Sequence, residues 1–404
     1  MNSSPGQSPT GVSLLHKSMN SIPMSSSLPA RPARHTTAAA VMWLSICACA
    51  TVQADTPLGW MNSDHLSAYT LNARKVDFTA SAIAVNESID FLNVREDLLA
   101  GTRQLEGDSG DLDGNRFELQ VGITSFLSAF YHRQQQDLTI DLGEISSINL
   151  TEIDSGLSTT ATGYGLKWNF FEAGHFDDAQ SWQAASLELT RTENSTDNFT
   201  GALDRITLSG NATVLFTEPQ TFRLQDMEDD GWQARFLYSF PLSSKMTTTL
   251  WLGYAETSAT SGTGSDIKVA SLATAFDQSF SVDENQMLVG AGLNWQATPR
   301  IPVQLSYEYI SITNSDVTTL VNPSNVLLPS FLRANNLGTV SADANHTLKG
   351  SISFWVTPKF NISLTGKLFS NQFLGVIPHY NNPLSGSFSE QPYGYAGIQL
   401  GLQL

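Results

Sequence analysis

The chain has 404 residues, with 38 Asp and Glu against 21 Lys and Arg, and its formal net charge at pH 7 is −17. Nucleic-acid binding needs basic patches, so this charge predicts no nucleic-acid partner. The length can hold two soluble domains or one large all-β domain.

The first 54 residues have the composition of a secretory signal. They contain no acidic residue, and Arg31 and Arg34 precede an apolar run at 38–50. The run is too short to span a bilayer as a helix, and small residues follow it, as at a signal-peptide cleavage site. We therefore predict cleavage after Ala54, which leaves residues 55–404 as a single domain.

Both cysteines, Cys47 and Cys49, lie inside this predicted signal, so the mature chain has no disulfide. A secreted chain of this size without disulfides favours a bacterial envelope protein over a eukaryotic extracellular module. Cleavage removes three basic residues and no acidic one, which changes the formal charge from −17 to −20. A later start at Met19 or Met24 and a lipoprotein anchored at Cys49 are open alternatives.

From about residue 115 onward, windows of about ten residues alternate apolar and polar side chains. This is the period of a strand with two different faces. In one window Met287, Val289 and Leu293 share one face, while Gly290 and Asn294 share the other. Eleven windows are predicted to be strands: 115–123, 125–138, 159–172, 181–193, 231–240, 245–257, 286–296, 301–312, 344–357, 360–370 and 392–404.

The connections between these windows alternate in length. Tight turns are expected at 241–245, 297–300 and 357–359. Long polar stretches are expected between them, at 194–230, 258–285, 313–343 and 371–391. Soluble sandwiches and solenoids also alternate along their strands, but they do not alternate short and long connections so regularly. The pattern is typical of a transmembrane β-barrel.

Such barrels have an even number of strands in bacteria, so the eleven windows need at least one more. Residues 88–94 supply one, and residues 65–71 and 75–85 could add two. We predict an all-β antiparallel transmembrane barrel of 14 strands, with 12 as the alternative. Residues 204–216 have the pattern of a hairpin within a long loop.

The chain resembles bacterial outer-membrane β-barrel proteins of the porin-like kind, in the format of residues 65–404. The resemblance implies a location in the bacterial outer membrane, short periplasmic turns and long extracellular loops. It also implies outer-membrane lipids, lipopolysaccharide and the barrel-assembly machinery as partners. In that family the last strand is read by the machinery, and Leu400, Leu402 and Leu404 occupy its alternating apolar positions. The chain departs from the family in ending on Leu404 where an aromatic residue is usual.

The polar faces of the strands are expected to point into the lumen. Five bases and three acids form no ring of a single sign, which a strongly selective pore would show. The sequence therefore predicts a channel in which small solutes diffuse passively through a polar lumen. The alternative is a plugged structural or adhesive barrel. The expected lumen-facing charged residues are Arg116, Glu118, Lys167, Glu188, Arg235, Glu308, Lys349 and Lys367.

The stretch 318–338 is unusually apolar for a surface loop. Its apolar cluster could form a constriction or a hydrophobic gate, as in a transporter for hydrophobic compounds, or a short helix packed on other loops. The cluster consists of Val326, Leu327, Leu328, Phe331 and Leu332.

No cofactor or metal site is predicted. Residues 108–115 resemble a calcium loop at Asp111 and Asp113, but Gln120 stands where the final Glu is needed. The acidic stretch 226–231 is predicted to be a surface charge cluster.

No enzyme is predicted. The best pairing of a base with a nucleophile is His132 with Ser128. Four residues along a strand separate such side chains by about 13 Å, which is too far for a catalytic dyad.

Overall fold

The computed structural model describes residues 66–85, 110–140, 148–153, 157–174, 182–207, 213–266, 268, 278–319, 344–369 and 393–404. All of them belong to the second of two compact units, Val52–Leu404, and not to the first, Met1–Thr51. Among these residues, no helix is long and apolar enough to cross a membrane.

The described secondary structure is entirely β. The strands are β1 (Val76–Val85), β2 (Gly110–Thr124), β3 (Leu127–Ile140), β4 (Ile148–Ile153), β5 (Leu157–Ala173), β6 (Gln183–Thr196), β7 (Phe199–Thr207), β8 (Thr213–Ser243), β9 (Met246–Ser265), β10 (Gln278–Thr298), β11 (Ile301–Thr319), β12 (Ala344–Thr357), β13 (Phe360–Phe369) and β14 (Tyr393–Gln403).

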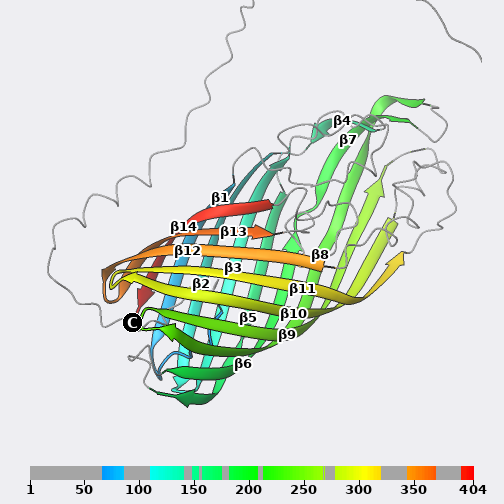
Figure 1. Cartoon of the computed structure of the whole chain (residues 1–404). Helices are drawn as coiled ribbons and strands as arrows, with labels where there is room; N and C mark the ends of the chain where they lie inside the picture. The colour runs from blue at the N-terminus through cyan, green and yellow to red at the C-terminus, as the bar shows by residue number, and fades with distance from the viewer. Residues whose placement is uncertain are drawn as a thin grey trace, which may run out of the picture. The chain divides into compact units, whose positions relative to one another are not determined.

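Twelve of these strands close into a barrel (Figure 1). The order around the ring is β1-β2-β3-β5-β6-β8-β9-β10-β11-β12-β13-β14, and every pairing is antiparallel. The ring closes where β1 pairs with β14, from Ala84 opposite Ala396 to Asp77 opposite Gln403. Two backbone hydrogen bonds between Val76 and Leu404, of 2.8 and 3.1 Å, complete this closure.

The 12-strand alternative is therefore confirmed, and the 14-strand reading is not. The eleven predicted windows and residues 75–85 supply the twelve strands of the barrel. Residues 66–71 form no strand although they alternate, because they lie against the inside of the barrel wall. Residues 88–94 lie outside the described residues.

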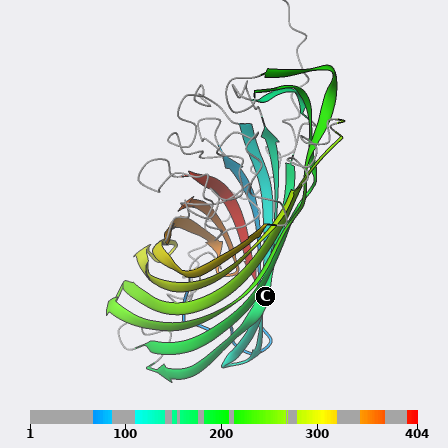
Figure 2. The same ribbon diagram turned by 90° about the vertical axis from the view of Figure 1, so that its right-hand side faces the viewer.

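The two ends of the barrel differ as expected. At one end the connections β2–β3, β8–β9, β10–β11 and β12–β13 leave only two residues between strands, and we call this the short-turn end. At the other end, the long-loop end, β8 continues outward and carries β7, which in turn carries β4 (Figures 1 and 2). The hairpin predicted at 204–216 is present, with Arg205 opposite Leu215 and Thr207 opposite Thr213. Much of the loop predicted at 194–230 is thus strand.

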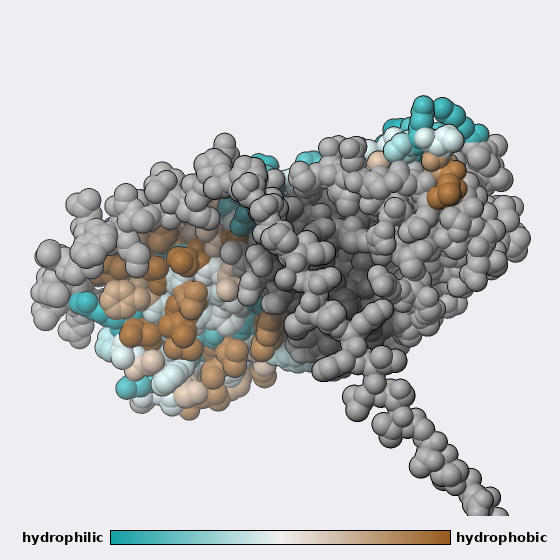
Figure 3. Space-filling view, turned by 90° about the horizontal axis from the view of Figure 1, so that it is seen from above, coloured by the Kyte–Doolittle hydropathy of each residue, from teal (hydrophilic) through white to brown (hydrophobic). Residues whose placement is uncertain are grey.

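The barrel wall is apolar outside and polar inside. On β13, for example, Ile362 and Leu364 are exposed, whereas Ser363 and Thr365 are buried. Figure 3 shows apolar side chains gathered on an exposed part of the wall. This is the reverse of a water-soluble protein and is the pattern of a barrel whose outer surface faces lipid. The chain is therefore an outer-membrane β-barrel protein.

Aromatic pairs on the outer surface mark both edges of the apolar band. Trp232 and Tyr254 lie 5.6 Å apart between ring centroids toward the long-loop end. Trp168 and Phe170 lie 5.5 Å apart toward the short-turn end. Such girdles sit at the two membrane interfaces.

Candidate functional site in the barrel lumen

The eight predicted charged residues lie on the inner face of the wall, within about 10 Å of one another in their positions along the strands. Each residue is five to eight positions from the strand terminus that lies at the short-turn end of the barrel. For example, Glu188 is five positions after Gln183, where β6 begins, and Arg235 is eight positions before Ser243, where β8 ends. The strands rise about 3.3 Å per residue, so this places all eight near the middle of the membrane. We call this set the charged belt: Arg116, Glu118, Lys167, Glu188, Arg235, Glu308, Lys349 and Lys367.

Ion pairs join several members of the belt into a chain. Lys167 lies opposite Glu188, and Glu188 lies opposite Arg235, so neighbouring strands present alternating signs. The nitrogen–oxygen distances are 3.1 Å for Lys167–Glu188 and 3.6 Å for Arg235–Glu188. Arg235 also contacts Glu308 at 3.0 Å, although two further strands, β9 and β10, separate β8 from β11. The pairing therefore links residues far apart along the wall.

Two glycines make room for this long-range contact. Gly253 lies opposite Arg235 on β9, and a Cβ there would come within 2.9 Å of Arg235 Cγ. Gly290 on β10 lies under the ring of Trp251, and a Cβ there would come within 2.3 Å of ring atoms. Trp251 in turn donates a hydrogen bond from Nε1 to Glu308, at 2.8 Å. Larger residues at either glycine would push these side chains away from Glu308.

A separate ion pair occupies β2. Arg116 and Glu118 are two residues apart on the inner face and contact each other at 2.5 Å. His132 lies opposite Glu118 on β3, and its ring lies over Gly163 of β5. Ser128, which the sequence places too far from His132 to form a dyad, accepts a hydrogen bond from the backbone N–H of Leu71, at 2.9 Å.

Residues 66–75, which we call the strap, lie inside the short-turn end of the lumen. The backbone N–H of Ala68 donates to Ser239 Oγ on β8, at 2.9 Å, and the N–H of Leu71 donates to Ser128 on β3. At its end, the N–H of Arg74 donates to the carbonyl of Gly122, at 2.8 Å. These partners satisfy backbone groups that would otherwise be buried without hydrogen bonds. The strap thus runs along the inner wall rather than forming a thirteenth strand.

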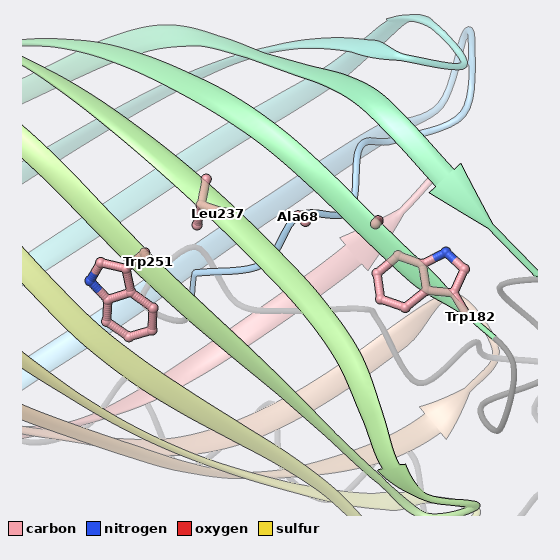
Figure 4. Close-up of a cluster of buried hydrophobic side chains, with 5 residues drawn as sticks. Ala68, Trp182, Leu237 and Trp251 are labelled. Carbon is pink, nitrogen blue, oxygen red and sulfur yellow. The ribbon is translucent and has the colours of Figure 1, made fainter.

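An apolar cluster anchors the strap. Ala68 packs with Trp182, Leu237 and Trp251, and all four are buried (Figure 4). Trp251 therefore takes part in both the anchor of the strap and the charged belt, because its N–H reaches Glu308. The sequence pattern did not indicate this cluster, since apolar residues were expected only on the outer face.

The opposite part of the wall carries many small side chains, together with the larger inward residues Trp355, Asn361 and Gln399. Ser351 donates to Gln304 at 3.0 Å, and Ser363 donates to Ser353 at 2.7 Å. We call this group the small-residue wall, and it lies on β1 and β12 to β14. It consists of Thr79, Ser351, Ser353, Ser363, Thr365 and Gly397.

Asp229 is a buried acid that the sequence placed on the surface. It lies beyond Trp232 toward the long-loop end, outside the apolar band, and its residue is 4% exposed. Asn194 donates a hydrogen bond to its Oδ1 at 2.5 Å. Burial raises the pKa of Asp229 from 3.8 to about 8. The surface assignment of 226–231 is thus wrong for Asp229, and its place on the same face as Arg235 is the signal that would have revealed it.

The other predicted sites are the apolar cluster of the loop 318–338 and the stretch that resembles a calcium loop. Val326, Leu327, Leu328, Phe331 and Leu332 lie outside the described residues. The stretch resembling a calcium loop is part of strand β2 from Gly110 onward. In the described ranges no three His, Cys, Asp or Glu side chains are placed to hold a metal ion.

No protein-family model and no curated relative matches the chain. Several solved structures do. The translocator domain of the autotransporter NalP from Neisseria meningitidis is 10% identical, with a TM-score of 0.44 over 84% of this chain and 91% of that one. An outer-membrane channel from Pseudomonas putida F1 is 8% identical, with a TM-score of 0.41 over 85% of this chain and 100% of that one.

The outer-membrane protease OmpT from Escherichia coli is also similar, at 9% identity and a TM-score of 0.32 over 84% of this chain and 100% of that one. This finding corrects the prediction that the chain is not an enzyme, because a protease stands among the similar barrels and the fold excludes no enzyme. Likenesses this distant carry no argument about the activity or substrate of this chain.

Proposed function

We propose that the chain is an outer-membrane channel through which small polar solutes diffuse passively. The observation that carries this proposal is the charged belt, which sets ionised groups of both signs in the middle of the membrane. Such groups are tolerated at this depth where they face a polar or water-filled interior. A transporter for hydrophobic compounds would need an apolar path, and the inner face at this depth is polar.

Side chains of several strands narrow the lumen. Bulky inward side chains include Arg235 on β8, Trp251 on β9, His132 on β3 and Trp355 on β12, and the strap is bonded to β2, β3 and β8. The side of β12 to β14 carries Ser, Thr and Gly beside the lysines of the belt.

A second candidate, a plugged surface barrel, is supported by the burial of the same wall. Ser363 and Ser353 are almost inaccessible to solvent although they face the lumen. A lumen filled by its own side chains leaves inward residues buried in this way.

Single-channel recording distinguishes the two candidates. Residues 55–404 would be refolded, inserted into planar lipid bilayers and recorded in KCl. We expect stable conductance steps, and we expect Ser363→Trp to reduce their size because the indole enters the lumen. The matched control is Leu364→Trp on the neighbouring, lipid-facing position, which should leave the steps unchanged. Silence from a barrel that folds, judged by heat-modifiable migration in gels, would overturn the channel in favour of the plugged barrel.

A further inference from the structure

The short-turn end of the barrel is basic along one arc of the wall. The arc runs from β8 through β9 to β14 and on to β1, and its described turns are 241–247, 297–301 and 356–360, with 72–77 leading into β1. Asp77 is the single acid among these residues, and it lies on the inner face of β1, opposite Gln120 and Gln403. The bases of this arc, which we call the basic rim, are Arg74, Lys75, Lys245, Arg300 and Lys359.

The charge of the rim faces water and lipid. Four of its bases are exposed, namely Arg74, Lys75, Lys245 and Lys359. Within the described part of the chain, no acid forms an ion pair with any of these four. Neighbouring tight turns on the arc are two strands apart, which is about 10 Å along the wall. This spacing is close to the Debye length of about 8 Å at physiological salt, so the potentials of adjacent bases overlap into one positive band.

Exposed apolar side chains lie on the membrane side of the rim. Leu242 on β8 is exposed three residues before Lys245. Phe78 on β1 is exposed three residues after Lys75. A lipid whose acyl chains lie on this apolar wall therefore brings its headgroup to the rim. Ammonium and guanidinium groups there offer several hydrogen-bond donors each, which suit the oxygens of a phosphate.

The long-loop end has the opposite charge. Residues 191–207 and 213–230, which cover the outer parts of β6 and β8 together with β7, contain eight acids and three bases. On the outer surface there, Arg191 is shared between Glu193 and Asp230. An anionic headgroup is thus repelled at this end and attracted at the other, which makes the two ends of the wall differ in the lipid they favour.

We infer that the basic rim binds anionic phospholipids of the leaflet at the short-turn end of the barrel. The partner is a lipid whose headgroup carries an ionised phosphate and no amine, such as phosphatidylglycerol. A zwitterionic headgroup, such as that of phosphatidylcholine, brings its own cation to the rim and gains less. Each base close to an anionic lipid strengthens the association by roughly 5-fold. The inference is independent of the proposed function, because it concerns the outer surface and holds whether or not the lumen conducts.

The test measures which lipid gathers at each end of the barrel. Residues 55–404 contain no cysteine, so one donor dye can be attached through Ser244→Cys, beside Lys245, or through Ser258→Cys, opposite Asp230 at the long-loop end. Each labelled barrel is reconstituted in phosphatidylcholine vesicles with a trace of phosphatidylglycerol or phosphatidylcholine that carries an acceptor dye on an acyl chain. From energy transfer at position 244 we expect an association constant roughly 5-fold or more in favour of phosphatidylglycerol. At position 258 we expect no such preference.

The charge of the rim is then removed. Lys245→Gln combined with Lys359→Gln, in the barrel labelled through Ser244→Cys, should lower the ratio toward 1. In the unsubstituted rim, 1 M KCl should do the same, because it shortens the Debye length to about 3 Å. The matched control, Arg223→Gln combined with Lys268→Gln, removes the same charge from exposed residues at the long-loop end and should leave the ratio unchanged.

Equal transfer to both lipids at position 244 of the unsubstituted rim would overturn the inference. A preference that survives in the double Gln variant, or one that is as strong at position 258, would overturn it as well. Folding of each variant is checked by heat-modifiable migration in gels. If the double variant does not fold, Lys245→Gln alone should still lower the ratio, and an unchanged ratio in that variant would equally refute the inference.

Discussion

Replacing Arg235 tests whether the ion pairs of the lumen stabilise the barrel. Its side chain is 12% exposed and contacts Glu188 and Glu308, which are 6% and 7% exposed. Breaking a buried ion pair by removing one partner costs about 3–5 kcal/mol, because a buried charge is left uncompensated. In Arg235→Gln, Lys167 still contacts Glu188, and Trp251 still donates to Glu308. We therefore expect the lower end, a loss of about 3 kcal/mol in the free energy of unfolding.

The assay is reversible urea unfolding in lipid vesicles, followed by tryptophan fluorescence. Combining Arg235→Gln with Glu308→Gln removes both charges, so we expect the pair of changes to restore about 2 kcal/mol of the loss. Lys245→Gln is the matched control, since Lys245 is exposed in the tight turn between β8 and β9 and its loss should change stability by less than about 0.5 kcal/mol. A loss below about 1 kcal/mol in Arg235→Gln, or no recovery in the double variant, would refute the reasoning.

Two further predictions concern the two ends of the lumen. A chain lacking residues 66–73 should conduct more than wild type in single-channel recordings, because the strap no longer narrows the short-turn end; an equal conductance would show that the strap does not limit permeation. At the long-loop end, the pKa of Asp229 is raised from 3.8 to about 8, so between these values the folded state keeps a proton that the unfolded chain has lost. Stability should therefore fall as pH rises through this window, and Asp229→Asn should flatten that fall in urea unfolding measured from pH 5 to 8. A wild-type stability that rises over the same range would contradict the assignment.

The faces of the strands could be predicted from the sequence, but the contacts between distant strands could not. A period of two fixes on which side Glu188 and Arg235 lie once the strand is recognised. The contact of Arg235 with Glu308 depends on the register of three strand pairings, β8–β9, β9–β10 and β10–β11, and on the space above Gly253 and Gly290. The alternation of apolar and polar residues within one strand predicts neither of these.

The strap is a second case in which the alternation of the sequence did not predict the structure. Residues 65–71 and 75–85 have similar alternation, yet only the second stretch finds partners on both edges, in β2 and β14. The apolar residues of the first, such as Leu71, are buried inside the barrel. Alternation predicts two faces, and the tertiary structure decides which surroundings each face meets.

The pairing of β1 with β14 has a consequence for how the barrel is assembled. Every other neighbour in the ring is reached through a single connection along the chain, whereas this seam joins Val76 to Leu404. Local hairpins form quickly, and contacts between the ends of a chain form slowly because a long loop must be closed first. Until then the nascent sheet has two unpaired edges, at β1 and at its most recently added strand, which can pair with other chains. Pairing of β14 with β1 thus ends this exposure, and a chain cut short before Tyr393 would keep both edges open.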